Sequence, residues 1–120
     1  AWTRVASTRS PWLARLEPGA VHTVAIAHGE GRVVGPDAEL RRLLEAGQVA
    51  TQYVDAEGRP TLDSEYNPNG SAYAIEGLLS PDGRVFGKMA HAERHTPHTW
   101  FNAPGAKDMQ LFEAGVAYFR

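Results

Sequence analysis

The sequence contains no cysteine among its 120 residues. This absence excludes disulfide bonds and thiolate metal ligands within it, although it assigns the protein to no compartment. No apolar run approaches the roughly 20 residues that a transmembrane helix needs, and no signal peptide opens the chain. The formal net charge of −2 predicts no broad attraction to nucleic acid or to anionic membranes. We therefore expect a soluble, cytoplasmic domain.

The residues that are present are sufficient for one packed domain. Hydrophobic residues make up 42% of the chain and include three tryptophans, and a chain of this length can bury a real core. The first six residues, AWTRVA, have the pattern of a strand interior with no turn before it. We therefore expect the chain to be a fragment of a larger domain.

Strands and helices alternate along the sequence. Strands are expected over 1–6, 21–27 (resumed at 32–34), 48–54, 73–79 and 84–90, and helices from Asp37 to Gly47 and from about Asp108 to the end. Asp37 is the expected N-cap of the first helix, and Gly47 suits the left-handed residue that ends it. The tetrapeptide Ser80-Pro81-Asp82-Gly83 predicts a hairpin turn. The pattern indicates an α/β fold with one strand–helix–strand crossover and one antiparallel hairpin.

The strongest candidate for chemistry is His91-Ala92-Glu93, directly after the last predicted strand. Reactive groups gather where strands of α/β sheets end, because side chains can converge there on a cleft. Glu93 could accept a hydrogen bond from one imidazole nitrogen of His91 and leave the other nitrogen free as a base. An H-x-E triplet is not specific, so an exposed histidine followed by an ordinary glutamate remains an alternative.

Two rival functions are also open for this segment. His91, Glu93 and His95 would share one face of a continued strand and could hold zinc or iron, which makes a metal-binding protein the first rival. A non-catalytic interaction module is the second. The segment His28-Gly29-Glu30-Gly31 is expected to shape the rim of a site or a domain contact. The loop Asn67-Pro68-Asn69-Gly70-Ser71 is expected to be a structured turn.

Several motifs in order along the chain together resemble one family. They are ASTRSPWL (6–13), IAHGEGR (26–32), QVATQYVD (48–55), NPNGS (67–71), SPDGRV (80–85), GKMAHAER (87–94) and LFEAG (111–115). The set is similar to the C-terminal half of the glutamine amidotransferase domain of phosphoribosylformylglycinamidine synthase, in its long single-chain form. The resemblance spans nearly the whole chain.

The resemblance implies a class I, triad-type glutaminase on a flavodoxin-like α/β sheet, with the antiparallel hairpin near the active site. In such enzymes a cysteine attacks the side-chain amide of glutamine, a histidine acts as general acid and base, and a glutamate two residues later orients it. The last two roles correspond to His91 and Glu93. The family has glycine at the position of Ala90 and often a small residue or proline at that of Ala92, and neither difference touches the two roles.

The resemblance also predicts which parts of the enzyme lie outside these 120 residues. We expect 1–120 to be the C-terminal portion of one amidotransferase domain, with the nucleophilic cysteine in an absent N-terminal half, so that the chain alone is inactive. The whole enzyme would pass ammonia to a synthetase domain that uses ATP and magnesium to make formylglycinamidine ribonucleotide. The expected partners are glutamine, the rest of the domain and the synthetase domain. We expect no cofactor or metal in this portion, and no nucleic-acid or membrane partner.

Overall fold

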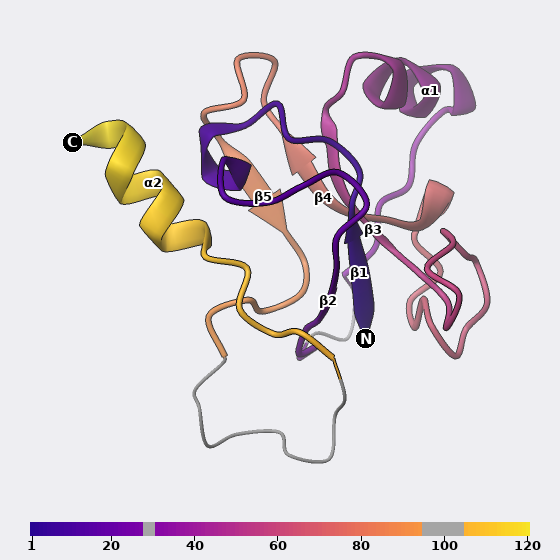
Figure 1. The fold of residues 1–120 in the computed structure, drawn as a ribbon. Helices are drawn as coiled ribbons and strands as arrows, with labels where there is room; N and C mark the ends of the chain where they lie inside the picture. Colours follow the sequence, from indigo (N-terminus) through magenta and orange to yellow (C-terminus); the bar gives the residue numbers. More distant parts are fainter. Residues whose placement is uncertain (28–30, 95–104) are drawn as a thin grey trace.

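The computed structural model describes residues 1–27, 31–94 and 105–120, and its centre is a five-stranded sheet (Figure 1). The strand order is β2-β1-β3-β4-β5, and every neighbouring pair is antiparallel. The strands are β1 (Trp2–Val5), β2 (Val21–Thr23), β3 (Val49–Tyr53), β4 (Ile75–Leu79) and β5 (Phe86–Lys88). The helical elements are α1 (Asp37–Glu45), α2 (Leu111–Phe119) and the 3-10 turns η1 (Pro11–Leu13) and η2 (Ala72–Ala74). The predicted α/β class is confirmed.

In the predicted crossover, the two connected strands β2 and β3 are not neighbours, because β1 lies between them in the sheet. Both β2 and β3 pair antiparallel with β1, which lies between them, so they run parallel to each other and α1 connects them. Strand β2 is shorter than the predicted 21–27, although Ala25 forms an isolated bridge with His91. Residues 32–34 do not resume a strand. The N–H of Val33 instead donates to the hydroxyl of Ser71 at 2.9 Å.

The predicted hairpin is present as β4 and β5. Gly77 lies opposite Lys88, and the turn between the strands has Gly83 at a positive φ of 75°, a backbone conformation that favours glycine. Strand β4 begins two residues later than predicted, because Tyr73 and Ala74 also have positive φ, at 52° and 58°. These two residues form part of η2 instead.

The segment around η1 holds the tip of the hairpin through three side chains. The hydroxyl of Ser10 donates to the carbonyl of Gly83 at 2.6 Å, and the indole N–H of Trp12 donates to the carbonyl of Arg84 at 2.8 Å. Arg9 donates to the carbonyl of Pro81 at 2.5 Å. Residues more than 70 positions apart in the chain therefore fix the hairpin relative to η1.

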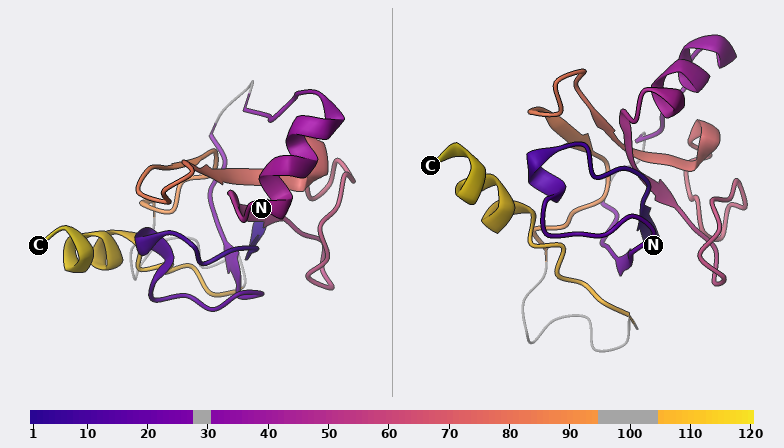
Figure 2. Two further views of the ribbon diagram at one scale, coloured as in Figure 1. Left: turned by 90° about the horizontal axis from the view of Figure 1, so that it is seen from above. Right: turned by 45° about the horizontal axis from the view of Figure 1, so that its top comes forward.

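Two apolar clusters lie on opposite faces of the sheet. Val49 belongs to one cluster and Ala50 to the other, as expected when successive side chains of a strand point to opposite faces. The first cluster includes Leu40 of α1, and the second includes Leu13 of η1 and Leu111 of α2. Figures 1 and 2 show α1 and α2 at opposite ends of the molecule. No helix of the described residues is long and apolar enough to cross a membrane.

Helix α1 differs from the prediction at its first residue. The N-cap position is held by Pro36, so the prediction that Asp37 caps the helix is wrong. Asp37 is the first helical residue, and its carboxylate lies 2.8 Å from the guanidinium of Arg41. A negative charge in the first turn still favours the helix, because the N-terminal end of the helix dipole is positive. Gly47, at a φ of 71°, follows the helix as predicted.

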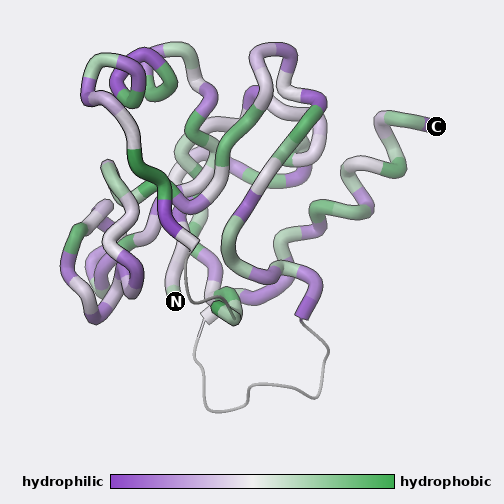
Figure 3. The backbone as a smooth tube through the Cα atoms, turned by 180° about the vertical axis from the view of Figure 1, so that it is seen from behind, coloured by the Kyte–Doolittle hydropathy of each residue, from purple (hydrophilic) through white to green (hydrophobic). Residues whose placement is uncertain are grey.

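Helix α2 packs mainly through three residues that are not aromatic, and its Phe119 ring also lies against Trp12, with the ring centroids 5.6 Å apart. It begins at Leu111 and buries Leu111, Ala114 and Gly115, whereas Phe112, Val116 and Phe119 are more than half exposed. Figure 3 shows the hydrophobic stretches of this helix where it projects from the rest of the chain. The close contact is with Trp12, whose ring lies where a side chain at Gly115 would be.

This contact predicts that Gly115→Ala destabilises the protein. An added Cβ would lie 2.2–2.8 Å from three ring atoms of Trp12, and that ring is held in place by its hydrogen bond to Arg84. Overpacking costs about 1–3 kcal/mol, and the gain in helix propensity from glycine to alanine returns at most about 1 kcal/mol. Because contacts of 2.2–2.8 Å are far inside van der Waals distance, we take the upper end of the overpacking cost and expect a net loss of about 2 kcal/mol in the free energy of unfolding, measured by urea denaturation.

The matched control is Gly87→Ala in β5. No atom lies within 4 Å of a Cβ added there, and the φ of Gly87 is not in the left-handed region. The control should change the free energy of unfolding by less than about 0.5 kcal/mol. A Gly115→Ala protein at least as stable as the unsubstituted one would contradict the packing described for α2.

Candidate active site at the end of the hairpin

His91 lies three residues beyond β5, where the hairpin leaves the sheet. Its backbone N–H donates to the carbonyl of Ala25 at 2.8 Å. The same pair of residues forms the isolated antiparallel bridge beyond β2. Two segments from opposite edges of the sheet therefore meet at His91 and fix its backbone.

The structure brings the side chains of His91 and Glu93 together. The Nδ1 atom of His91 lies 2.5 Å from Oε1 of Glu93. The imidazole side chain is 29% exposed and the carboxylate side chain 52% exposed. In the neutral tautomer that has its proton on Nδ1, this N–H donates a hydrogen bond to the carboxylate of Glu93. The other nitrogen, Nε2, is then unprotonated and can accept a proton. The spacing in the sequence predicted this contact; the catalytic role of the two residues stays a prediction.

The contact favours the ionised form of Glu93. Its pKa is lowered first by the hydrogen bond from His91 and then by its own backbone N–H. The charge of Arg94 has a weaker effect in the same direction. A carboxylate that stays ionised can hold the imidazole in one tautomer and stabilise the imidazolium when it forms.

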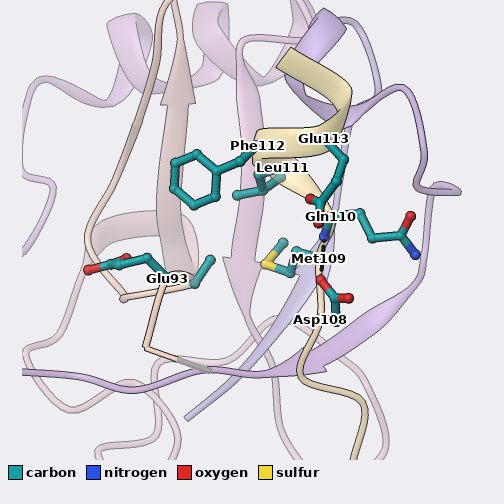
Figure 4. A pocket seen from close by; sticks show the side chains of 8 residues that line it. Glu93, Asp108, Met109, Gln110, Leu111, Phe112 and Glu113 are labelled. Carbon is teal, nitrogen blue, oxygen red and sulfur yellow. Dashed lines mark hydrogen bonds between the residues drawn. The ribbon is translucent and has the colours of Figure 1, made fainter. Parts of the chain in front are cut away.

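Two cavities flank the pair. One, of about 340 Å³, lies between the end of the hairpin, η1 and α2, and its lining includes Trp12, Lys88, His91, Glu93 and Phe112. The other, of about 360 Å³, lies between Glu93 and the segment 108–113. Figure 4 shows Glu93 on one side of this second cavity and Asp108 to Glu113 on the other, with Asp108 accepting from the N–H of Gln110 at 2.9 Å. Of these two cavities, only the first has His91 in its lining.

Sequence reasoning missed a buried ion pair next to His91. The ammonium of Lys88 binds the carboxylate of Glu76, and their side chains are 9% and 0% exposed. The signal that could have found it is a negative charge inside one apolar strand of the predicted hairpin, at Glu76, and a positive charge inside the other, at Lys88. That signal becomes specific only with the register, which places Lys88 opposite Gly77.

The loop Asn67 to Ser71 is a structured turn, as predicted. Asn67 and Ser71 are fully buried. The amide of Asn67 donates to the carbonyl of Ser71 at 3.0 Å and accepts from its N–H at 3.0 Å. The hydroxyl of Ser71 donates to the carbonyl of Ile75, directly before the bulged part of β4. Most of the segment 28–31, expected at the rim of the site, lies outside the described residues; only Gly31 is described.

The metal-binding alternative receives no support. The structure describes two of its three expected ligands, His91 and Glu93, and these bind each other. His95, the third, lies outside the described residues. Within the ranges that the structure describes, no group of three or more histidine, aspartate or glutamate residues could hold a metal ion.

Comparison with known proteins shows a match over nearly the whole chain. A sequence model of the CobB/CobQ-like glutamine amidotransferase domain matches residues 1–119. The chain is 48% identical over 93 residues to phosphoribosylformylglycinamidine synthase subunit PurQ of Thermomicrobium roseum, a match covering 78% of this chain and 39% of that protein. It is 40% identical over 114 residues to the same subunit of Gloeobacter violaceus, covering 95% of this chain and 47% of that protein.

A solved structure has a similar fold. The structure of PurLQS from Thermotoga maritima matches with a TM-score of 0.68 and 27% sequence identity, over 99% of this chain and 46% of that chain. The present chain therefore spans less than half the length of the proteins that it resembles.

The contact between His91 and Glu93 predicts a change in titration. We expect His91→Ala to raise the pKa of Glu93 towards its ordinary value, because the mutation removes the hydrogen bond that favours the carboxylate. The pKa can be measured by carbon-13 NMR of the glutamate side chains. Arg94→Ala is the matched control and should raise this pKa less, because Arg94 is the weaker cause. An unchanged pKa in His91→Ala would contradict the contact.

Proposed function

The chain belongs to the CobB/CobQ-like glutamine amidotransferase domain family, and we propose that it is the C-terminal portion of a glutaminase that supplies ammonia for purine biosynthesis. The observation that carries the proposal is the contact between His91 and Glu93 in a chain that matches this family over residues 1–119. The family predicted from the motifs is confirmed. The relatives are named as a subunit, so the long single-chain form stays a prediction.

In this proposal His91 is the general acid and base of glutamine hydrolysis. A cysteine thiolate elsewhere in the complete protein attacks the side-chain carbonyl carbon of glutamine. The imidazolium of His91, which holds the proton that the cysteine thiol has given up, donates it to the leaving amide nitrogen as the carbon–nitrogen bond breaks, and ammonia departs. Nε2 of His91 then takes a proton from a water molecule, whose oxygen attacks the thioester. The carbon–sulfur bond breaks, glutamate leaves, and the thiolate is restored.

Glu93 is the orienting carboxylate. Its Oε1 atom holds Nδ1 of His91, so that Nε2 is the nitrogen available to the reacting atoms. The lowered pKa of Glu93 keeps it ionised when the imidazolium forms. This follows the general logic of a nucleophile, a base and a group that orients the base.

The partners belong to the same proposal. A synthetase would take up the ammonia and use ATP and magnesium to convert formylglycinamide ribonucleotide to formylglycinamidine ribonucleotide. Support comes from the relatives, which are named as subunits of phosphoribosylformylglycinamidine synthase, and from the similar fold found in PurLQS. The 120 residues alone would be inactive, because they contain no cysteine. We place the complete enzyme in the cytoplasm.

The direct test is His91→Ala in the complete enzyme. We expect glutamine-dependent synthesis to fall by about 100-fold or more, because general acid–base catalysis contributes about 10²–10⁴-fold. Synthesis from added ammonium salt should be unchanged, because it bypasses glutamine hydrolysis. Both rates can be measured with the same assay of the amidine product. Glu93→Gln should lower only the glutamine-dependent rate, and by a smaller factor.

His95→Ala separates the proposal from the metal-binding alternative. A site made of His91, Glu93 and His95 would lose activity equally in His91→Ala and His95→Ala, and both would lose bound metal by elemental analysis. The proposed role of His91 does not require His95. Equal loss of the glutamine- and ammonia-dependent rates in His91→Ala would overturn the assignment.

A further inference from the structure

Glu76 is a buried carboxylate at an irregular point of the sheet. It is 1% exposed. In the pairing of β3 with β4, Gln52 lies opposite Ile75 and Thr51 lies opposite Gly77, so Glu76 is an extra residue with no partner on β3. This is a β-bulge, which changes the direction of the side chain at the extra residue.

The carboxylate of Glu76 is bound on both of its oxygens. Oε1 binds the ammonium of Lys88, and Oε2 accepts from the hydroxyl of Thr51 at 3.0 Å. These three residues come from β4, β5 and β3, so the contact links three neighbouring strands. A buried ion pair is weak evidence for stability, because its desolvation cost offsets its attraction and apolar residues of similar size often serve as well. The position of the pair in the sheet says more about its role than its contribution to stability does.

The pair also holds the segment that leads to His91. The carbonyl of Glu76 accepts from the N–H of Met89 at 3.0 Å, and the ammonium of Lys88 donates to the carbonyl of Ala90 at 3.4 Å. Both contacts lie between the end of β5 and His91. They are followed by the hydrogen bond from the N–H of His91 to Ala25. Lys88 also lines the cavity that contains the imidazole.

We propose that Glu76, with Lys88, is a positioning residue for His91. This inference rests on the proposed function. The carboxylate of Glu76 holds the ammonium of Lys88, which donates to the carbonyl of Ala90 directly before His91, and the pair so sets where the imidazole lies against the cavity. Acid–base catalysis depends on such placement, because a displacement of about 1 Å can cost about 100-fold in rate. Glu76 and Lys88 touch no reacting atom in this role.

The test is the double variant Glu76→Gln/Lys88→Met in the complete enzyme. It removes both charges together, because Lys88→Met alone would leave the Glu76 charge buried without a partner. We expect kcat with glutamine to fall at least about tenfold and KM for glutamine to stay within about twofold, since the residues act on placement and not on binding. The ammonia-dependent rate and the melting temperature should be close to those of the unsubstituted enzyme.

The matched control is Glu39→Gln/Arg42→Met, which removes an ion pair on the exposed surface of α1 and should change neither kcat nor KM. If Glu76→Gln/Lys88→Met does not fold, Thr51→Val removes only one hydrogen bond to the Glu76 carboxylate and should lower kcat by a few fold at unchanged KM.

Two outcomes would overturn the proposal. One is an unchanged kcat in the variant that folds, and the other is a parallel fall of the glutamine-dependent rate, the ammonia-dependent rate and the melting temperature. Glutamine-dependent activity retained in His91→Ala would instead overturn the proposed function.

Discussion

The pairing of β4 with β5 is the interaction on which the candidate site depends. The hairpin places His91 at the edge of the sheet, and its tip is tied to η1 through Ser10 and Trp12. Trp12 in turn packs against Gly115 and sets the position of α2. The cavity beside His91 is lined from all three elements, so a shift in the hairpin register would displace His91 relative to the walls that η1 and α2 supply.

Local chemistry accounts for the parts that the sequence predicted well. The Ser80–Gly83 turn needs only the dihedral preferences of proline, aspartate and glycine, and the contact of His91 with Glu93 needs only a spacing of two residues. Gly47 marked the end of α1 for the same reason. The predicted ends of elements were wrong by one or two residues where neighbouring residues can take the same position, as at the N-cap of α1, which Pro36 holds in place of Asp37.

The parts that were not predicted depend on contacts between distant residues. Nothing in the residue types of Tyr73 and Ala74 indicates a positive φ, and only the structure around η2 imposes it. Nothing within the sequence of α2 indicates that Trp12 packs against Gly115, because the two residues are about a hundred positions apart in the chain. The link from Glu76 to Lys88 follows from a β-bulge, which is a property of paired strands and has no signature in one strand alone.

If His91 is the base of the proposed reaction, its contact with Glu93 limits where the nucleophile can lie. Glu93 occupies Nδ1 of His91, so a thiolate that exchanges a proton with the ring must lie within hydrogen-bond reach of Nε2. Of the two cavities, only the one between the hairpin, η1 and α2 has His91 in its lining. Its described wall offers His91, Glu93 and Lys88 but no thiol, and Lys88 is already paired with Glu76. Under the proposed function, the cysteine of the complete protein would therefore have to reach this cavity, where the contacts at the end of the hairpin hold His91 in place.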